Sequence, residues 1–180
     1  AELVKGNGRF TGACPTHPHQ SPQYQRAMCR GQHPRVAVLG CSDSRVPPEL
    51  VFDQGLGDLF DVRVAGNVVD DAVLGSLEYA VAHLGVSLVV VMGHSHCGAV
   101  EAALAHAHPH NHIHAIVRAL APAVRGAQGS AEVAAKRNVL QALERLAEAP
   151  VLRERLRGGE LRLAGAYCDL ETGRVSFTPY

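Results

Sequence analysis

The sequence predicts an α/β fold: a mostly parallel central sheet flanked by helices, with an antiparallel C-terminal hairpin as edge strand and an N-terminal arm. Three short apolar runs rich in β-branched residues are typical of parallel strands buried on both faces. They are Val36–Leu39, Leu59–Ala65 and Leu88–Met92. Helical patterns or glycine-bearing loops separate these runs, as expected for the crossover connections of a parallel sheet.

The N-terminal segment is punctuated by proline and glycine. We therefore expect residues 1–35 to form an arm of a single domain that spans residues 1–180. The next segment with a clear pattern, 70–85, predicts a crossover helix. Its apolar residues fall on one face, between an acidic start at Asp70 and a glycine stop at Gly85.

Two further helices and the hairpin complete the predicted fold. One helix is expected over 99–107, and another over 131–156 with an interruption at Pro150, because proline cannot continue a helical hydrogen-bond ladder. The segments 160–169 and 174–178 flank a glycine-bearing turn and predict the C-terminal hairpin.

The composition argues against several classes of function. Lysine plus arginine (17) balance aspartate plus glutamate (17), so no broad positive field is available to bind nucleic acid or an anionic membrane. The longest apolar run, 87–93, is far shorter than the ~20 residues of a membrane-spanning helix. Five cysteines are too few for a disulfide framework, which favours a reducing compartment such as the cytoplasm. A cleaved export signal would leave no trace in the sequence.

Two polar motifs directly follow two of the predicted strands. The first is Gly40–Arg45 (GCSDSR) and the second is Gly93–Gly98 (GHSHCG). Because the carboxyl ends of parallel strands form one crevice, we expect these motifs to meet although they lie far apart in the sequence. Cys41, His94 and Cys97 would then offer two thiolates and an imidazole. That set suits a catalytic zinc ion with an open fourth position.

Two alternatives compete with this ligand set. A cysteine or histidine at a strand end is often only packed in the core, and His96 is a rival ligand in the second motif. The spacing favours His94 and Cys97, because the first turn of a helix can present both to one ion. The helix dipole should also help to keep Cys97 ionised.

Asp43 and Arg45 follow the first ligand closely. If the chain stays extended, both side chains face the crevice. The guanidinium would keep the carboxylate ionised, ready to accept a hydrogen bond from metal-bound water or to become a fourth ligand in a closed form. The alternative is an exposed ion pair of little consequence.

The two motifs together resemble the paired Cys-x-Asp-x-Arg and His-x-x-Cys signature of β-class carbonic anhydrases, and the resemblance covers residues 30–180. It implies a zinc enzyme that reversibly hydrates carbon dioxide to bicarbonate and a proton by a zinc-bound hydroxide. It also implies self-association to a dimer or tetramer. Gln32 and the backbone N–H of Gly98 would bind the substrate, while Phe60 and Tyr79 would form an apolar wall shared between neighbouring subunits.

The chain departs from the resemblance at a regulatory pocket. Arg63 matches the arginine with which some members bind regulatory bicarbonate, but the tryptophan and tyrosine of that pocket are replaced by Val38 and Cys168. The resemblance therefore implies catalysis without this regulation.

Other functions and roles stay open at this point. A hydrolase of carbon disulfide or carbonyl sulfide would use the same ligands, and a zinc-stabilised scaffold protein would close the fourth position. His83 is one candidate proton shuttle. The tract His106–His114, with histidine at every second position, is another. Such a tract can also bind metal adventitiously, and the plainest alternative is a solvated loop in which histidine is merely tolerated.

Overall fold

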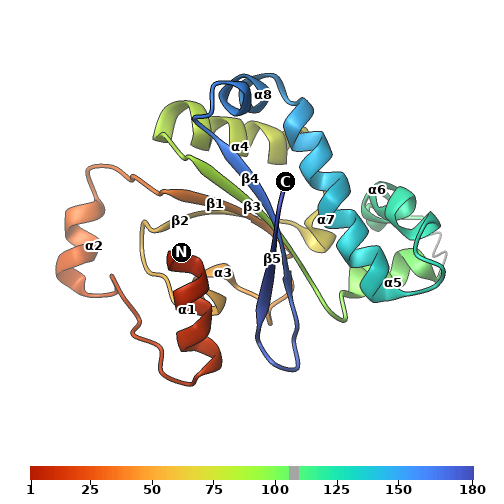
Figure 1. Cartoon of the computed structure of the whole chain (residues 1–180), viewed down its shortest axis with the longest axis horizontal. Helices are drawn as coiled ribbons and strands as arrows, with labels where there is room; N and C mark the ends of the chain where they lie inside the picture. Colours follow the sequence, from red (N-terminus) through yellow and green to blue (C-terminus); the bar gives the residue numbers. More distant parts are fainter. Residues whose placement is uncertain (106–109) are drawn as a thin grey trace.

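The computed structural model describes residues 1–105 and 110–180 and has an α/β fold (Figure 1). Within these residues the strands are β1 (Val36–Gly40), β2 (Leu59–Arg63), β3 (Leu88–His94), β4 (Arg162–Cys168) and β5 (Val175–Pro179). They form one sheet in the order β2-β1-β3-β4-β5. Strands β1 to β4 run parallel, and β5 pairs antiparallel with β4. The predicted sheet and its C-terminal hairpin are confirmed.

Helices cover the sheet from both sides. The helical elements of the described residues are α1 (Glu2–Thr11), α2 (Pro22–Met28), α3 (Pro48–Val51), the 3-10 turn η1 (Ala65–Asn67), α4 (Asp71–Leu84), α5 (Gly98–Leu104), α6 (Ile113–Arg125), α7 (Ala131–Glu148) and α8 (Pro150–Arg157). In Figure 1, α4, α7 and α8 lie above the sheet and α1 and α3 below it, with α5 and α6 at one side.

The two faces of the sheet bury alternate residues of the same strand. In β1, Ala37 and Leu39 pack in an apolar cluster with residues of α4 and α8, which we call the α4 cluster. Val38 packs in a second cluster with residues of α5 and α6, the α6 cluster. All three side chains are fully buried. Burial on both faces explains why β1 has no polar side.

Local signals set the bounds of the predicted helices. The side chain of Asp70 accepts a hydrogen bond from the backbone N–H of Val73 at 2.8 Å, and Gly85 ends α4 in the left-handed conformation (φ 71°). The expected interruption at Pro150 separates α7 from α8, because the residue before a proline is driven out of the helical conformation. Both predictions are confirmed.

A buried side chain fastens α1 to the rest of the molecule. The amide nitrogen of Asn7 donates to the carbonyl oxygens of Val51 (3.1 Å) and Gly173 (2.9 Å), and its oxygen accepts from the N–H of Val175 (2.9 Å). These contacts tie α1 to α3 and to the β4–β5 hairpin. The proline and glycine pattern of residues 1–35 gives no sign of them.

Helix α6 is absent from the sequence-based prediction. It begins at Ile113, directly after the exposed His112, and includes His114, so the end of the histidine tract is helical rather than a loop. Residues 106–109 of the tract lie outside the described residues. The helix expected over 99–107 ends earlier, at Leu104. No helix in the described part of the chain combines the length and hydropathy needed to cross a membrane.

Candidate metal centre and active site

Two neighbouring strands bring the predicted metal ligands together. Cys41 directly follows β1, His94 is the last residue of β3, and Cys97 is the N-cap of α5. Because β1 and β3 pair in parallel, with Gly40 beside Met92, both motifs open at the same edge of the sheet. The predicted convergence is confirmed. The prediction that His94 shares a helical turn with Cys97 is wrong, since His94 belongs to the strand.

The ligand atoms of Cys41, His94 and Cys97 lie within 4.8 Å of one another, and all three residues are buried. Nδ1 of His94 lies 2.8 Å from the carbonyl oxygen of Ser95 and donates to it, which leaves the lone pair on Nε2. That Nε2 is buried with no hydrogen-bond partner in the described chain. An unpartnered imidazole nitrogen beside two thiols fits zinc, which binds such nitrogen and sulfur atoms at about 2.0–2.3 Å. The three residues form the zinc site.

The electrostatics of the site favour a thiolate at Cys41. Its contact with Cys97 lowers the pKa of the Cys41 thiol most, and His94 and two backbone N–H groups add to this, so that the pKa falls to about 4 although burial opposes the shift. The pKa of Cys97 is raised, first by Cys41 and then by burial, even though two N–H groups of α5 oppose the rise. A bound divalent cation would ionise both thiols.

Asp43 and Arg45 form a two-pronged ion pair at the edge of the cluster. Nε of Arg45 lies 2.9 Å from Oδ1 of Asp43, and Nη2 lies 2.7 Å from Oδ2. The N–H of Arg45 also donates to Oδ1, so the chain turns here rather than staying extended as expected. The guanidinium holds the pKa of Asp43 well below its usual range. Nη2 further donates to the carbonyl of His96 (3.0 Å) and links the two motifs.

Arg63 and Gly66 support the first motif from the end of β2. Nε and Nη2 of Arg63 donate to the carbonyl oxygens of Cys41 (2.9 Å) and Asp43 (2.6 Å). The N–H of Gly66 donates to the sulfur of Cys41 at 3.2 Å. The sequence-based prediction missed Gly66, because a backbone donor has no side-chain signature. Its glycine identity, needed for a positive φ of 70°, is the one signal that could have found it.

Some predicted residues lie outside the zinc cluster. The side chain of His96 is exposed and is not part of the ligand group. Gly98 is exposed at the start of α5, where the first N–H groups of a helix have no partner within that helix. Gln32 is exposed in the segment that precedes β1.

Phe60 and Tyr79 lie beside each other on the opposite face of the sheet. Their ring centroids are 6.4 Å apart, and Tyr79 also contacts the ring of His83 at 5.1 Å. Phe60 packs against the α4 cluster, whereas Cys41 and Cys97 belong to the α6 cluster. Within one chain, the structure therefore does not bring this aromatic pair to the zinc cluster. Tyr79 is 49% exposed and available to another molecule.

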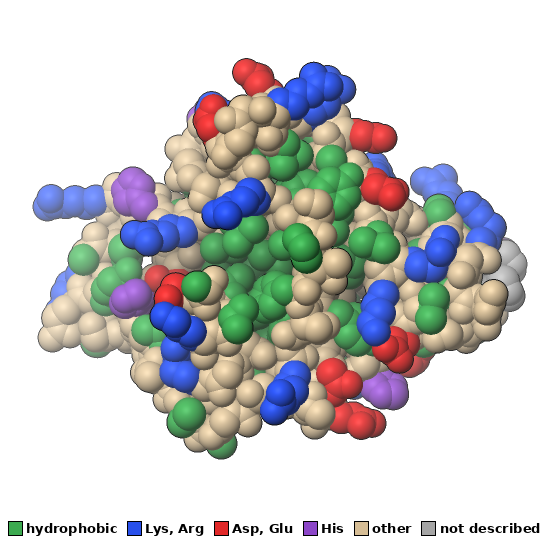
Figure 2. All heavy atoms as spheres, viewed as in Figure 1, with side chains coloured by type: hydrophobic (Ala, Val, Ile, Leu, Met, Phe, Trp, Pro, Cys, Tyr) green, Lys and Arg blue, Asp and Glu red, His purple; other side chains and the backbone are tan. Residues whose placement is uncertain are grey.

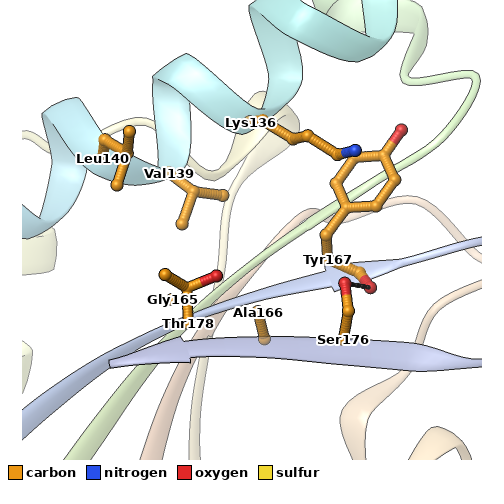
Figure 3. Close-up of a pocket in the computed structure, with 8 residues that line it drawn as sticks. All are labelled: Lys136, Val139, Leu140, Gly165, Ala166, Tyr167, Ser176 and Thr178. Atoms are coloured by element: carbon orange, nitrogen blue, oxygen red, sulfur yellow. Dashed lines mark hydrogen bonds between the residues drawn. The ribbon is translucent and has the colours of Figure 1, made fainter. Parts of the chain in front are cut away.

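A separate hollow of about 270 Å³ lies between α7 and the β4–β5 hairpin, on the face where hydrophobic side chains gather in Figure 2. Nζ of Lys136 lies 4.8 Å from the centroid of the Tyr167 ring at one end of it (Figure 3). The lining residues are Lys136, Val139, Leu140, Gly165, Ala166, Tyr167, Ser176 and Thr178. None of them is a zinc ligand, so the hollow is distinct from the metal centre.

Comparison with known proteins agrees with the metal centre. A family model described as carbonic anhydrase matches residues 36–175. Carbonic anhydrase 2 of Mycobacterium tuberculosis is 42% identical over 182 residues, covering 96% of this chain and 88% of the relative. The carbonic anhydrase of Synechococcus elongatus is 35% identical, with coverages of 97% and 70%. A tetrameric β-carbonic anhydrase of the ascomycete Sordaria macrospora aligns in structure with a TM-score of 0.81 at 28% identity, covering 97% of this chain and 93% of that one. The chain belongs to the carbonic anhydrase family, in its β class.

Proposed function

We propose that the zinc centre hydrates carbon dioxide reversibly to bicarbonate and a proton, with Asp43 and Arg45 acting on the reacting water. The carbonic anhydrase activity follows from the family and the zinc ligands. The roles of the other residues rest on one observation above all. Oδ2 of Asp43 lies 3.9 Å from Nε2 of His94, while both carboxylate oxygens are held by Arg45.

The chemistry divides between the metal and the side chains near it. When bound, zinc lowers the pKa of a coordinated water toward neutrality, which makes that water a nucleophile for carbon dioxide. An ionised carboxylate accepts hydrogen bonds and donates none, so Asp43 would accept a hydrogen bond from the coordinated water and leave an oxygen lone pair free to meet the substrate carbon. Arg45 fixes the direction of the carboxylate and keeps it away from the ligand atoms, which is the open form of the site.

The substrate pocket is proposed to include a second copy of the chain. Gly98 would offer its N–H to the substrate from the same chain as the zinc ligands. Gln32 would donate to the substrate as well. Phe60 and Tyr79 would come from the neighbour, since both lie on the far face of their own sheet. The tetrameric state of the Sordaria relative supports a dimer or tetramer here. Sedimentation of the zinc-loaded protein tests this, and a fully active monomer would contradict it.

Regulation by a second bicarbonate is not part of the proposed function. Val38 and Cys168 are buried, and neither offers the polar group of the residue that it replaces. Burial raises the pKa of the Cys168 thiol to about 11, so this side chain stays neutral. Arg63, the third member of that pocket, already donates to two carbonyl oxygens of the first motif.

The proposed compartment is the cytoplasm. All five cysteines of the chain are free thiols, and two of them are zinc ligands. An oxidising compartment would favour their conversion to disulfides.

A stopped-flow assay of carbon dioxide hydration tests the proposed function. Turnover should scale with the zinc content of the preparation, and the same preparation should show little activity on carbon disulfide or carbonyl sulfide. A protein that hydrolyses either sulfur compound but leaves carbon dioxide untouched would be a hydrolase instead. A zinc-bound protein inactive on all three would be a scaffold.

A further inference from the structure

We propose that Asn138 is a positioning residue of the zinc centre. Through Gly66, it fixes the backbone N–H whose hydrogen bond the sulfur of Cys41 accepts. The inference rests on the zinc site of the proposed function and adds to it a residue of α7 that neither binds the metal nor touches the substrate.

Asn138 is a polar side chain in the buried face of α7. It is 2% exposed, and the buried α7 residues around it are apolar, among them Ala134, Ala135 and Ala142. Its amide nitrogen donates to the carbonyl oxygen of Gly66 at 2.8 Å. Burying an amide costs free energy unless it is hydrogen-bonded. The bond to the Gly66 carbonyl is therefore what offsets the cost of burying the Asn138 amide in an apolar helix face.

The backbone conformation, the packing and the hydrogen bonds of Gly66 all restrict its position. Its φ of 70° lies in the left-handed region, and a Cβ atom here would lie 3.1 Å from the Cβ of Ala99 and 3.2 Å from Cδ1 of Leu120. Asn138 holds its carbonyl group. The N–H of the same residue then lies 3.2 Å from the sulfur of Cys41. Without the bond to Asn138, Gly66 loses the anchor that keeps its N–H aimed at the thiolate.

The hydrogen bond at the sulfur matters for the metal. A donor on a thiolate draws off part of its negative charge, which raises the energy of the sulfur-to-metal charge-transfer band. The same donor also fixes the direction in which the sulfur meets a bound cation, and metal affinity depends on this orientation. Outer partners that orient a metal ligand typically change metal affinity or activity by about 10–100-fold when removed. Asn138 acts one residue further out than Gly66, and no other described side chain bonds to the Gly66 carbonyl.

The test compares two variants of Asn138 with a matched control on the same helix. Asn138→Asp keeps the shape of the side chain but puts a carboxylate oxygen in place of the N–H donor. Asn138→Leu replaces the amide by an apolar group of similar volume. Gln141→Leu is the control, because Gln141 also donates from α7 to a backbone carbonyl, that of Ala119 at 3.0 Å, away from the zinc site. Zinc affinity is measured by chelator competition, and the sulfur-to-metal charge-transfer band is recorded on the cobalt-substituted protein.

We expect both Asn138 variants to bind zinc about 10–100-fold more weakly and to shift the charge-transfer band to lower energy. The Gln141 variant should keep native values. Folded Asn138 variants with native affinity and a native band would overturn the proposal. A native protein that binds no zinc or hydrates no carbon dioxide would instead contradict the proposed function.

The unmodified protein gives a second test that does not depend on how the variants fold. In the cadmium-113 form, NMR should show a scalar coupling between the amide proton of Gly66 and the metal, transmitted through the Cys41 sulfur. The side-chain amide protons of Asn138 should also exchange slowly with solvent. If the coupling is absent or these protons exchange freely, the proposal is wrong.

Discussion

Oδ2 of Asp43 lies 3.9 Å from Nε2 of His94, the nitrogen through which this histidine binds zinc. A carboxylate oxygen this close to a metal ligand can either direct the bound water or displace it. The guanidinium of Arg45 decides between these outcomes, because it occupies both oxygens of the carboxylate. Asp43 is therefore poised beside the metal without being free to bind it.

Replacing Arg45 should release Asp43. We expect Arg45→Ala to lower kcat/KM by about 10–100-fold with the zinc content unchanged, because the freed carboxylate competes with water for the metal. Arg45→Lys should retain part of the activity, since lysine supplies the positive charge but not the two parallel N–H donors that hold both oxygens of the carboxylate. The exposed Arg26 of α2 gives the control Arg26→Ala. An Arg45→Ala enzyme as active as this control would contradict the assigned role.

The pH dependence of activity should be simple. The pKa of Asp43 is held well below its usual range, first by the hydrogen bond from the Arg45 side chain, so the carboxylate stays ionised throughout the neutral range and does not titrate there. Activity should rise with pH along a single, non-cooperative titration curve, and added bicarbonate should act only as product. Stopped-flow rates between pH 6 and 9 would settle this; a steep cooperative loss below neutrality is the opposing result.

Zinc content should depend on two cysteines. Cys41→Ser and Cys97→Ser should each lose most of the metal, because each removes one thiolate from the cluster. Cys14→Ser and Cys29→Ser should keep one zinc per subunit, as both residues are exposed and lie outside the cluster. Cys168→Ser should also keep it. Metal analysis of the purified variants provides the measurement, and zinc loss confined to the last three variants would show that the ligands are misassigned.

Acid should weaken the attachment of the N-terminal segment through Asp53. This buried carboxylate accepts hydrogen bonds from Arg9 and from the backbone of Thr16 and His17, and these bonds hold its pKa well below the usual range although burial acts against the shift. Because the folded pKa is the lower one, the stabilisation is present above the unfolded pKa of about 3.9. It is lost as the pH falls through the folded pKa.

Thermal unfolding of Asp53→Asn measures this contribution. Asparagine tolerates the left-handed backbone found here (φ 44°), so the comparison reports the loss of the charge and of one acceptor oxygen rather than backbone strain. We expect about 2 kcal/mol of destabilisation at pH 7, or a drop in Tm of roughly 4–8 °C. The difference from the native protein should shrink toward pH 3. Glu2→Gln, at an exposed ion pair, should leave Tm nearly unchanged.

The features that could be predicted from the sequence have local signals. The strands that carry Cys41 and His94 are short buried runs of β-branched residues, and the polar motifs stand at their ends. The bounds of α4 follow from Asp70 and Gly85, which cap it in the expected way. Helix α6 was missed because its apolar stripe begins within a histidine-rich stretch, and the internal Pro122 argues against a helix.

The long-range contacts that support the site and fasten α1 could not be predicted in this way. Arg63, Asn7 and Asn138 all donate from side chains to backbone carbonyl oxygens far away in the sequence. Every residue carries such a carbonyl, so nothing in the sequence marks which one will be the acceptor. The turn between Asp43 and Arg45 is local, yet the pattern of residues fits an extended chain equally well.

The placement of the ligands at the ends of two paired strands also determines when the metal can enter during folding. Cys41 and Cys97 are far apart in the chain, and they come together only after β1 has paired with β3. In an unfolded chain, binding one ion to both cysteines would require closing the loop between them, at a large cost in conformational entropy. The sheet should therefore form first and capture zinc late, so that chelators strip the metal from a protein whose strands remain paired, and reloading needs no refolding.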